Sequence, residues 1–401
     1  MHSRALPKLI SATVEPVVLA VDGAHHYRFV AVEFGGTKDG VGNIIQLGTS
    51  QEKRIEDLPH HIEFDRVFIH ATSPLGQRRG IAANGKFVKI INSHIEGIRR
   101  KGDESQAIAA WSTDGPIEIV NNYLEAAAIN ILFGGGAPVL PLVPTDCIVK
   151  DNHLNKPIEW KGTDWVVKNL FEIKNGKRIR IENNLMTHNW GMGQDGMAVL
   201  FTTRMDSGEA TVIEDITFTG NIVRGSGGAL SVMGGEGAGG RRLTVSNNVF
   251  EDIDGSKWNS AGRFMKASDW DGLVIDNNTI LQTGNISVAW GESVKGFVFR
   301  NNIVFENEYG FAGDGTRPGR DVIEKYFSNG EVRGNIIIGG SDRNYDRTNI
   351  LLPSISGIQF RDPGNGDYRL AADSPYRRRG VGGTHIGADL DPRTVGRSMV
   401  P

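Results

Sequence analysis

A short pattern recurs along the chain, and it constrains the fold more than any other feature. Alternating apolar residues lead into two small polar residues, often Asn-Asn, and another apolar residue follows. The second polar position falls at residues 66, 93, 122, 152, 184, 221, 248, 278, 302 and 335, so the copies lie between 24 (278 to 302) and 37 (184 to 221) residues apart. A strand-turn-strand unit at a drifting period of about 30 predicts a solenoid of stacked coils with loops of variable length.

The clearest copies share an Asn-Asn turn, which suits a parallel β-helix. They begin at Ile117, Ile179, Leu243, Leu273 and Phe297. Asparagine tolerates a left-handed φ, and stacked amides can hydrogen-bond from coil to coil. A second apolar segment lies between successive turns, and helical periodicity is almost absent. We therefore expect an all-β fold, a single-stranded parallel β-helix of about ten to eleven coils with Asn-rich turns.

Composition excludes several other classes of protein. The 401 residues include 52 glycines and a single cysteine, Cys147, and the formal net charge is −3. One cysteine allows neither an internal disulfide nor a Cys-based zinc cluster. The chain has no block of five basic residues. It also has no apolar run that approaches a length of about 18 residues, which a membrane span requires. We expect no nucleic-acid partner and no membrane partner.

The repeat ends near residue 341, where Pro353 and the run Arg377-Arg378-Arg379 mark a change of character. An open solenoid end invites aggregation. We therefore expect residues 1–340 to form the β-helix, and residues 341–401 to form a C-terminal capping segment packed on it. The N-terminus lacks the architecture of a signal peptide, so we expect the native N-terminal coil and a secretion signal to be missing. We also expect a monomer.

Five stretches carry a family resemblance: residues 105–108, 121–125, 131–135, 165–174 and the ending at 367–389. Over roughly residues 20 to 390 the chain resembles the right-handed parallel β-helix proteins of the pectate-lyase-like superfamily. Within it, the chain looks like a large group of secreted bacterial β-helix proteins. The resemblance implies a right-handed coil, a secreted or periplasmic location, and a groove along one sheet that holds a carbohydrate, commonly an acidic uronate polysaccharide. It does not fix the chemistry, because one fold hosts many activities.

The leading hypothesis for function is a polysaccharide lyase acting by β-elimination. Such an enzyme needs a base for the C5 proton, a group that neutralises the uronate carboxylate, and a proton source for the leaving oxygen. If Phe171 and Ile173 point inward, alternation sends Lys168 and Glu172 onto the outer face and turns Asn169 inward. Arg204 follows one coil later.

We expect Lys168 to be the base and Arg204, at a comparable height, to be the acid or charge neutraliser. A stacked Lys and Arg resembles the catalytic pair of the alginate-lyase and chondroitinase-B type of β-helix lyase. His188 is a third catalytic candidate, because its ordinary pKa suits proton transfer. Candidate substrate-binding residues combine a central amide, aromatic rings that can stack on sugars and a basic side chain: Asn130, Trp111, Trp190 and Lys266.

Calcium is a possible cofactor, since Ca²⁺ takes six to eight hard oxygen ligands. Its candidate ligands are Asp114, Glu172 and Asp195. The doublets His25-His26 and His60-His61 also suggest a metal site. We do not expect one there, because neighbouring residues on a strand point to opposite faces and cannot bind one ion together.

Two alternatives to a lyase stay open. A glycoside hydrolase needs two carboxylates a short distance apart, and the acidic loops around Asp195 and Asp269 are the candidates. A non-catalytic β-helix that binds glycans, or serves as a surface module, would explain why no catalytic signature is intact.

Overall fold

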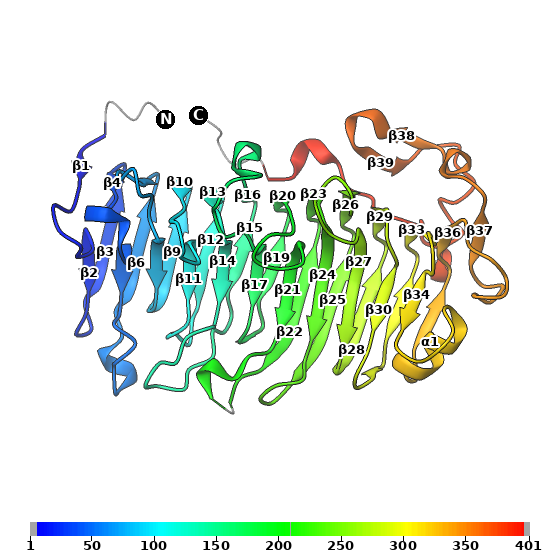
Figure 1. Ribbon diagram of the computed structural model, residues 1–401, viewed down its shortest axis with the longest axis horizontal. Coiled ribbons are helices and arrows are strands. Elements are labelled where there is room, and N and C mark those ends of the chain that lie inside the picture. Colours follow the sequence, from blue (N-terminus) through cyan, green and yellow to red (C-terminus); the bar gives the residue numbers. More distant parts are fainter. Residues whose placement is uncertain (1–5, 209, 397–401) are drawn as a thin grey trace.

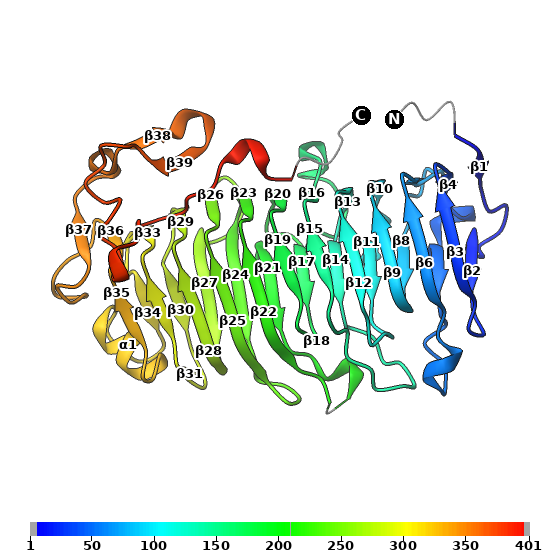
Figure 2. The same cartoon turned by 180° about the vertical axis from the view of Figure 1, so that it is seen from behind.

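The structure, a computed structural model, describes residues 6–208 and 210–396. The chain winds through successive coils, and their strands stack into three long parallel sheets, which we call A, B and C in coil order (Figure 1). The view from behind shows the same stack from its opposite side (Figure 2). The expected all-β parallel β-helix is confirmed.

Sheet A follows the Asn turn of each coil. Its strands are, in sheet order, β1 Lys8–Leu9, β4 Glu33–Gly35, β7 Phe68–His70, β10 His94–Ile98, β13 Tyr123–Ala126, β16 His153–Asn155, β20 Leu185–Asn189, β23 Ile222–Ser226, β26 Val249–Ile253, β29 Thr279–Gln282, β33 Ile303–Phe305, β36 Ile336–Ile338 and β37 Ile350–Leu352. Sheet B comes next along each coil. It contains β2 Val18–Ala20, β5 Asn43–Leu47, β8 Arg79–Ala83, β11 Gln106–Ala110, β14 Ile129–Phe133, β17 Asn169–Ile173, β21 Met197–Thr202, β24 Gly228–Met233, β27 Arg263–Ser268, β30 Ser287–Ala289 and β34 Phe311–Gly313.

Sheet C completes the coil. It contains β3 His25–Val30, β6 His60–Asp65, β9 Lys86–Ile91, β12 Ile117–Val120, β15 Ile148–Lys150, β19 Arg180–Glu182, β22 Ile213–Thr219, β25 Gly240–Ser246, β28 Trp270–Asp276, β32 Val298–Arg300 and β35 Glu331–Arg333, with β18 Gly176–Lys177 beside β22 and β31 Val294–Lys295 beside β28. The remaining elements are the antiparallel pair β38 Phe360–Asp362 and β39 Asp367–Leu370, helix α1 Arg320–Tyr326, and the 3₁₀ turns Lys38–Gly40, Ile55–Asp57, Ile158–Trp160, Met205–Ser207, Ile355–Ile358, Pro363–Asn365, Val381–Gly383 and Pro392–Thr394.

The two residues at the turn between sheets C and A, which are both asparagine in the clearest copies, have different roles. The first adopts a left-handed φ, +58° at Asn121. The second is fully buried and joins a ladder of amides, in which Asn122 Nδ2 donates to Asn152 Oδ1 at 2.9 Å and Asn152 Nδ2 donates to Asn184 Oδ1 at 2.9 Å. The ladder continues through Asn221, Asn248, Asn278, Asn302, Asn335 and Asn349. Both roles expected for the Asn pairs are confirmed.

Segments near the C-terminus pack on the last coils and on the middle of the coil stack. Helix α1 packs Val322 and Tyr326 into the core cluster beside the last coils. Residues 381–396 then run back along the Asn turns, from Asn301, whose Oδ1 accepts from the Val381 amide at 2.7 Å, to the coil of Asn183. The division into domains at residue 340 stays a prediction, and its ends at 1–5 and 397–401 lie outside the described residues.

Aromatic and aliphatic side chains fill the interior between the three sheets, including phenylalanines in edge-to-face contact such as Phe133, Phe171 and Phe201. None of the helices in the described residues has the length and hydropathy that crossing a bilayer requires.

Candidate functional site

The strands of sheet B begin with a bend that interrupts the alternation of side chains. In β17 the consecutive residues Leu170 and Phe171 both pack into the core, and Ala198 and Val199 do the same in β21. The residue before each such pair therefore lies on the outer side. Asn169 donates from Nδ2 to Gln194 Oε1, at 2.8 Å, in the loop before β21. The strict alternation expected from the sequence, which turned Asn169 inward, is wrong, because Leu170 packs into the core instead.

Asn130 lies inside the coil because of the same bend. Its position matches that of Leu170 on the next strand, since Ile129 pairs with Asn169. It is fully buried, and its Nδ2 donates to the carbonyls of Leu124 at 2.8 Å and Asn155 at 2.9 Å. Asn130 is therefore structural, and the expectation that it binds substrate is wrong.

The interior partner of Asn130 is Lys156, which sequence reasoning did not single out. Its Nζ donates to Asn130 Oδ1 at 3.1 Å and to the carbonyls of Ala126, Ala128 and Asn169 at 3.0 to 3.1 Å. Complete burial lowers the pKa of this lysine. The contacts fix the corner at which the chain enters sheet B.

One outward row of sheet B carries the carboxylate of Glu172. The pairing of strands places Leu132 on one side of Glu172 and Leu200 on the other. Glu172 is only 2% exposed, and its Oε2 has no hydrogen-bond partner among the described residues. Burial raises the pKa of Glu172, and the positive charges of Lys174, Lys168 and Arg204 oppose that rise. A buried, unpartnered carboxylate near three cations is typical of a functional site.

A groove of about 610 Å³ opens on this face of sheet B. The guanidinium of Arg79 lies 4.7 Å from the Trp111 ring centroid and donates to Gln106 Oε1 at 2.8 Å. The lining combines basic, acidic, amide and aromatic side chains with a glycine-rich edge: Asn43, Arg78, Arg79, Asp103, Glu104, Gln106, Trp111, Leu132, residues 134–136 and Lys174. Such a surface offers both stacking and hydrogen bonds to a polar chain.

Lys174 lies at the edge of the groove, where glycines make room for it. Its side chain is 18% exposed, and Nζ is 4.0 Å from Asp206 Oδ2. A Cβ on Gly135, whose φ is +78°, would lie 2.9 Å from Lys174 Cδ. The backbone N–H of Arg204 donates to the carbonyl of Lys174 at 3.3 Å. Lys174 and Arg204 therefore stand together at the downstream end of sheet B.

Lys168 lies at the upstream end of the strand instead. It precedes β17, its Nζ donates to Glu104 Oε1 at 2.9 Å, and it is 8% exposed. Because Phe171 pairs with Val199, residue 168 aligns with residue 196, and Arg204 follows eight positions later (204 − 196). That offset is roughly 26 Å of strand. The expectation that Lys168 and Arg204 lie at a comparable height is wrong, because Arg204 follows β21 rather than ending it.

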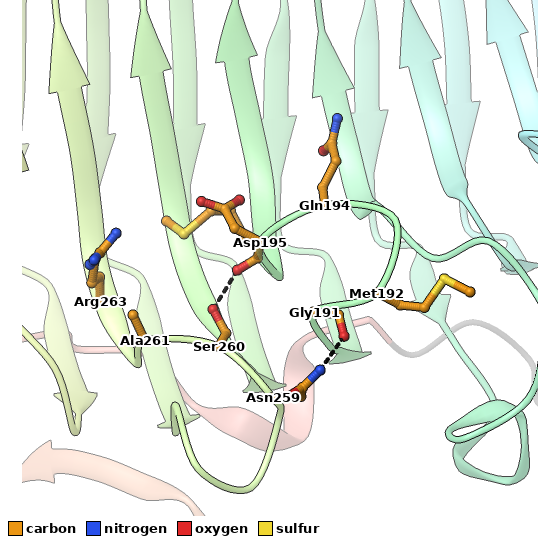
Figure 3. Close-up of a pocket in the computed structure, with 9 residues that line it drawn as sticks. Gly191, Met192, Gln194, Asp195, Asn259, Ser260, Ala261 and Arg263 are labelled. Carbon is orange, nitrogen blue, oxygen red and sulfur yellow. Dashed lines mark hydrogen bonds between the residues drawn. The ribbon is translucent and has the colours of Figure 1, made fainter.

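A second hollow, of about 430 Å³, lies further along the same side of the solenoid. Figure 3 shows the loop of Gly191 and Asp195 beside Asn259, whose Nδ2 donates to the Gly191 carbonyl at 2.7 Å. Asp195 forms an ion pair with Lys266, whose side chain is 15% exposed. Lys266 lies in the outward row of sheet B, next to Ser231, so its ammonium is on the groove side but neutralised by Asp195.

Comparison with solved structures identifies the fold. Over 98% of its length the chain is similar to the structure of the PL6 family alginate lyase AlyGC, with a TM-score of 0.58 and 14% sequence identity. The fold is a right-handed parallel β-helix of the pectate-lyase-like type. This chain covers 53%, about half, of the length of the AlyGC chain. No protein-family model matches the sequence, and no curated protein matches it.

Two of the residues expected in the groove of this β-helix lie elsewhere. His188 belongs to sheet A, where its Nδ1 is 3.2 Å from Asn155 Oδ1 and its ring stacks on Trp258. Burial lowers the pKa of His188. Trp190 is 3% exposed and packs with Trp258 and Trp160 between the loops that join sheets A and B. The coil turns both side chains away from the groove over sheet B, so the expectation that they lie in it is wrong, and the catalytic role of His188 and the sugar-binding role of Trp190 stay predictions.

The three acidic residues proposed as calcium ligands are not brought together. In the described part of the chain, the groups of metal-ligating side chains close enough to share an ion do not include them. Glu172 lies within β17, Asp195 precedes β21, and Asp114 follows β11, where it is 3.3 Å from Lys86 Nζ. They occupy different corners of the cross-section. Asp195 and Asp269, the acidic residues considered for a hydrolase, are also separated. Asp195 precedes a strand of sheet B, β21, whereas Asp269 follows another, β27, so the two lie at opposite ends of the strands.

Sequence reasoning missed Arg79, Gln106 and Glu104, which line the groove, and Gln194, which lines the second hollow. Arg79, Gln106 and Asn169 occupy the first position of their strands, directly before the residues that turn inward. Aligning the second strand of each repeat, rather than assuming alternation, would have found this row. Glu104 and Gln194 lie in loops of variable length, and no repeat predicts their positions.

Proposed function

We propose that this β-helix is a polysaccharide lyase that cleaves a uronate-containing polysaccharide by β-elimination in the groove over sheet B. The observation that carries the proposal is the buried Glu172, which lies on β17 with an unpartnered oxygen, while Lys168 precedes that strand and Lys174 follows it. An uncompensated carboxylate is costly in a site with only a structural role. A uronate substrate brings the carboxyl group that such a site neutralises.

The base is Lys174, and Arg204 is the group that stabilises the developing charge and supplies the proton. Lys174 lines the groove, its acidic neighbour Asp206 is 4.0 Å away, and Arg204 is joined to it through the backbone. A neutral amine takes the proton from C5, electrons form the C4–C5 double bond, and the glycosidic oxygen leaves with a proton. Lys168 is the second candidate base, and its ion pair with Glu104 must open before it can act.

Glu172 neutralises the uronate carboxylate in one of two ways. Burial raises its pKa and so favours the neutral form, and in that form Glu172 would donate a hydrogen bond to the substrate carboxylate. Alternatively, Glu172 Oε2 and the buried, unpartnered Asn169 Oδ1 supply two hard oxygens to a calcium ion. Bound there, calcium would supply positive charge near the substrate carboxylate.

The substrate class follows from the lining of the groove. Arg79 and Lys174 bring positive charge, Gln106 brings an amide, and Trp111 is a partly exposed ring over which a sugar can stack. AlyGC, the structural neighbour, is an alginate lyase, and alginate is therefore the first substrate to try. A long uronate polymer lies outside the cytoplasm, so we propose a secreted or periplasmic location for an enzyme that cleaves it.

Ultraviolet absorbance of the new C4–C5 double bond tests the proposal. The purified chain is mixed with alginate, pectate and glycosaminoglycans, with added Ca²⁺ and separately with a chelator. We expect absorbance to rise on at least one polymer and to be lost in Lys174→Ala. Lys89→Ala is the matched control, because Lys89 is a half-exposed lysine of sheet C paired with Glu118. A flat trace on all polymers, together with tight polymer binding, would replace the lyase by a glycan-binding module.

A further inference from the structure

Two histidine doublets lie one above the other at the N-terminal end of the solenoid. His25 and His26 begin β3 of the first coil, and His60 and His61 begin β6 of the second. His25 pairs directly with His60 across the two strands. We call these four residues the histidine cluster; it lies near the blue end of the chain in Figure 1.

The backbone turns the two histidines of each doublet toward one another. His26 has a φ of +60° and His61 a φ of +54°. An extended strand would send neighbouring side chains to opposite faces, and this was the reason to doubt a metal site here. The left-handed residue removes that objection. Nδ1 of His25 is 2.7 Å from Nδ1 of His26, and Nδ1 of His60 is 2.8 Å from Nδ1 of His61.

The rings of the two coils also stack in register. The His25 and His60 centroids are 4.8 Å apart with planes 6° from parallel, and those of His26 and His61 are 4.7 Å apart at 4°. The ligand nitrogens of His26, His60 and His61 all lie within 4.8 Å of one another. Imidazole nitrogens from two coils therefore surround one small volume.

The chemistry of the donors selects the type of ion. Imidazole nitrogen binds Zn²⁺, Ni²⁺ and Cu²⁺, whereas Ca²⁺ and Mg²⁺ require oxygen ligands. The imidazoles must be neutral to bind a metal. Burial and the neighbouring histidines lower the pKa of His60, and Lys86 acts in the same direction. Three of the four side chains are exposed, so an ion can reach them from solvent.

We propose that the histidine cluster binds one divalent ion of the zinc, nickel and copper class, and that this ion ties the first coil to the second. Among the described residues, β3 pairs with β6 alone in sheet C, so a shared ion would add a link between these two coils. A ligand that binds only the folded state stabilises it by an amount that grows with the logarithm of its concentration relative to its dissociation constant. The proposal is independent of the chemistry in the groove over sheet B.

Calorimetric titration of the chelator-treated full chain with ZnCl₂ tests the proposal, with MgCl₂ as the negative probe. We expect one equivalent of Zn²⁺ to bind, and Zn²⁺ to raise the melting temperature. The variant carrying His26→Ala and His61→Ala should lose at least tenfold in affinity and lose the thermal shift. His94→Gln, which changes a histidine on sheet A that contacts Glu96, should keep both.

Folding of the variants is checked by comparing their metal-free melting temperatures. If the double alanine variant melts well below the wild type, His26→Gln with His61→Gln keeps a polar side chain at each position and replaces it in the titration. No Zn²⁺ binding by the wild type would overturn the proposal. Zn²⁺ binding that survives both double variants at wild-type affinity would overturn it as well, since the ion would then lie elsewhere.

Discussion

Lys174 and Arg204 meet at the downstream end of sheet B, where the Arg204 amide donates to the Lys174 carbonyl at 3.3 Å. A lysine and an arginine on adjacent coils are thus joined through their backbones at the edge of the groove, where the Arg204 side chain also pairs with Glu236 at 2.5 Å. The lysine is not the one expected from the sequence, because Lys168 lies at the other end of β17 and pairs with Glu104.

Replacing each lysine separately distinguishes the two candidate bases. Lys174→Ala should lower kcat at least about a hundredfold, the scale of general base catalysis. Lys168→Ala and Glu104→Gln should change kcat by less than about fivefold, since their ion pair shapes the groove wall without touching the reacting atoms. Initial rates on the best polymer give both values. A larger loss in Lys168→Ala than in Lys174→Ala would transfer the role of base to Lys168.

Glu172→Gln should separate stability from activity. The folded-state pKa of Glu172 is raised, so the folded protein binds its proton more tightly, and its ionisation costs stability as the pH rises above about 4.5. The variant should therefore unfold at higher urea than the wild type at neutral pH in chelator, by about 1 kcal/mol, and equal it near pH 4. Its activity should fall at least about a hundredfold. A destabilised variant with full activity would make Glu172 a structural residue.

Trp111→Ala should raise KM about tenfold and leave kcat within about threefold, because stacking on a sugar ring contributes binding shared by substrate and transition state. Trp190→Ala is the contrasting variant. Trp190 is 3% exposed within an aromatic cluster, so its loss should cost about 3 kcal/mol or more of stability with KM unchanged. Steady-state kinetics on long chains, together with thermal melts, measure both effects. Equal KM values for Trp111→Ala and wild type would remove Trp111 from the binding surface.

His153 should make the fold sensitive to acid. It lies on sheet A with Nε2 2.8 Å from Thr187 Oγ1, and burial lowers its pKa to about 4. A lowered folded-state pKa means that the unfolded chain binds the proton first, so stability present above about pH 6.5 is lost as the pH falls toward 4. The loss is about 3 kcal/mol for the whole shift. Urea unfolding of His153→Gln should depend less steeply on pH over this range, and an unchanged slope would contradict the assignment.

The repeat predicted the fold well because the feature that defines it is local. A left-handed first residue and a buried second residue recur in every turn, as at Asn121 and Asn122, and a single sequence displays both. The strand positions of sheet B were harder to predict, since Leu170 and Phe171 face the core in succession and shift the orientation of Asn169. Alternation alone cannot reveal such a bend. Asn130 was misplaced for this reason.

Loop residues of the candidate site were beyond the reach of the sequence. Glu104 meets Lys168 across 64 residues, and Asp195 meets Lys266 across 71. The loops that bring these residues into contact differ in length from coil to coil, so the period of the repeat does not predict the contacts. The histidine doublets were visible in the sequence, but their left-handed φ angles were not, and the angles decide whether the imidazoles converge.

Cleavage in heavy-oxygen water tests the central claim most directly. Hydrolysis adds one water per bond cleaved and places its oxygen on one of the two new chain ends, whereas β-elimination adds no water and leaves an unsaturated uronate at the new non-reducing end. Mass spectrometry of the oligosaccharides released by the wild-type chain should show unsaturated ends without heavy oxygen, and Lys174→Ala should release none. Saturated products that carry one heavy oxygen would contradict the lyase and make the protein a hydrolase.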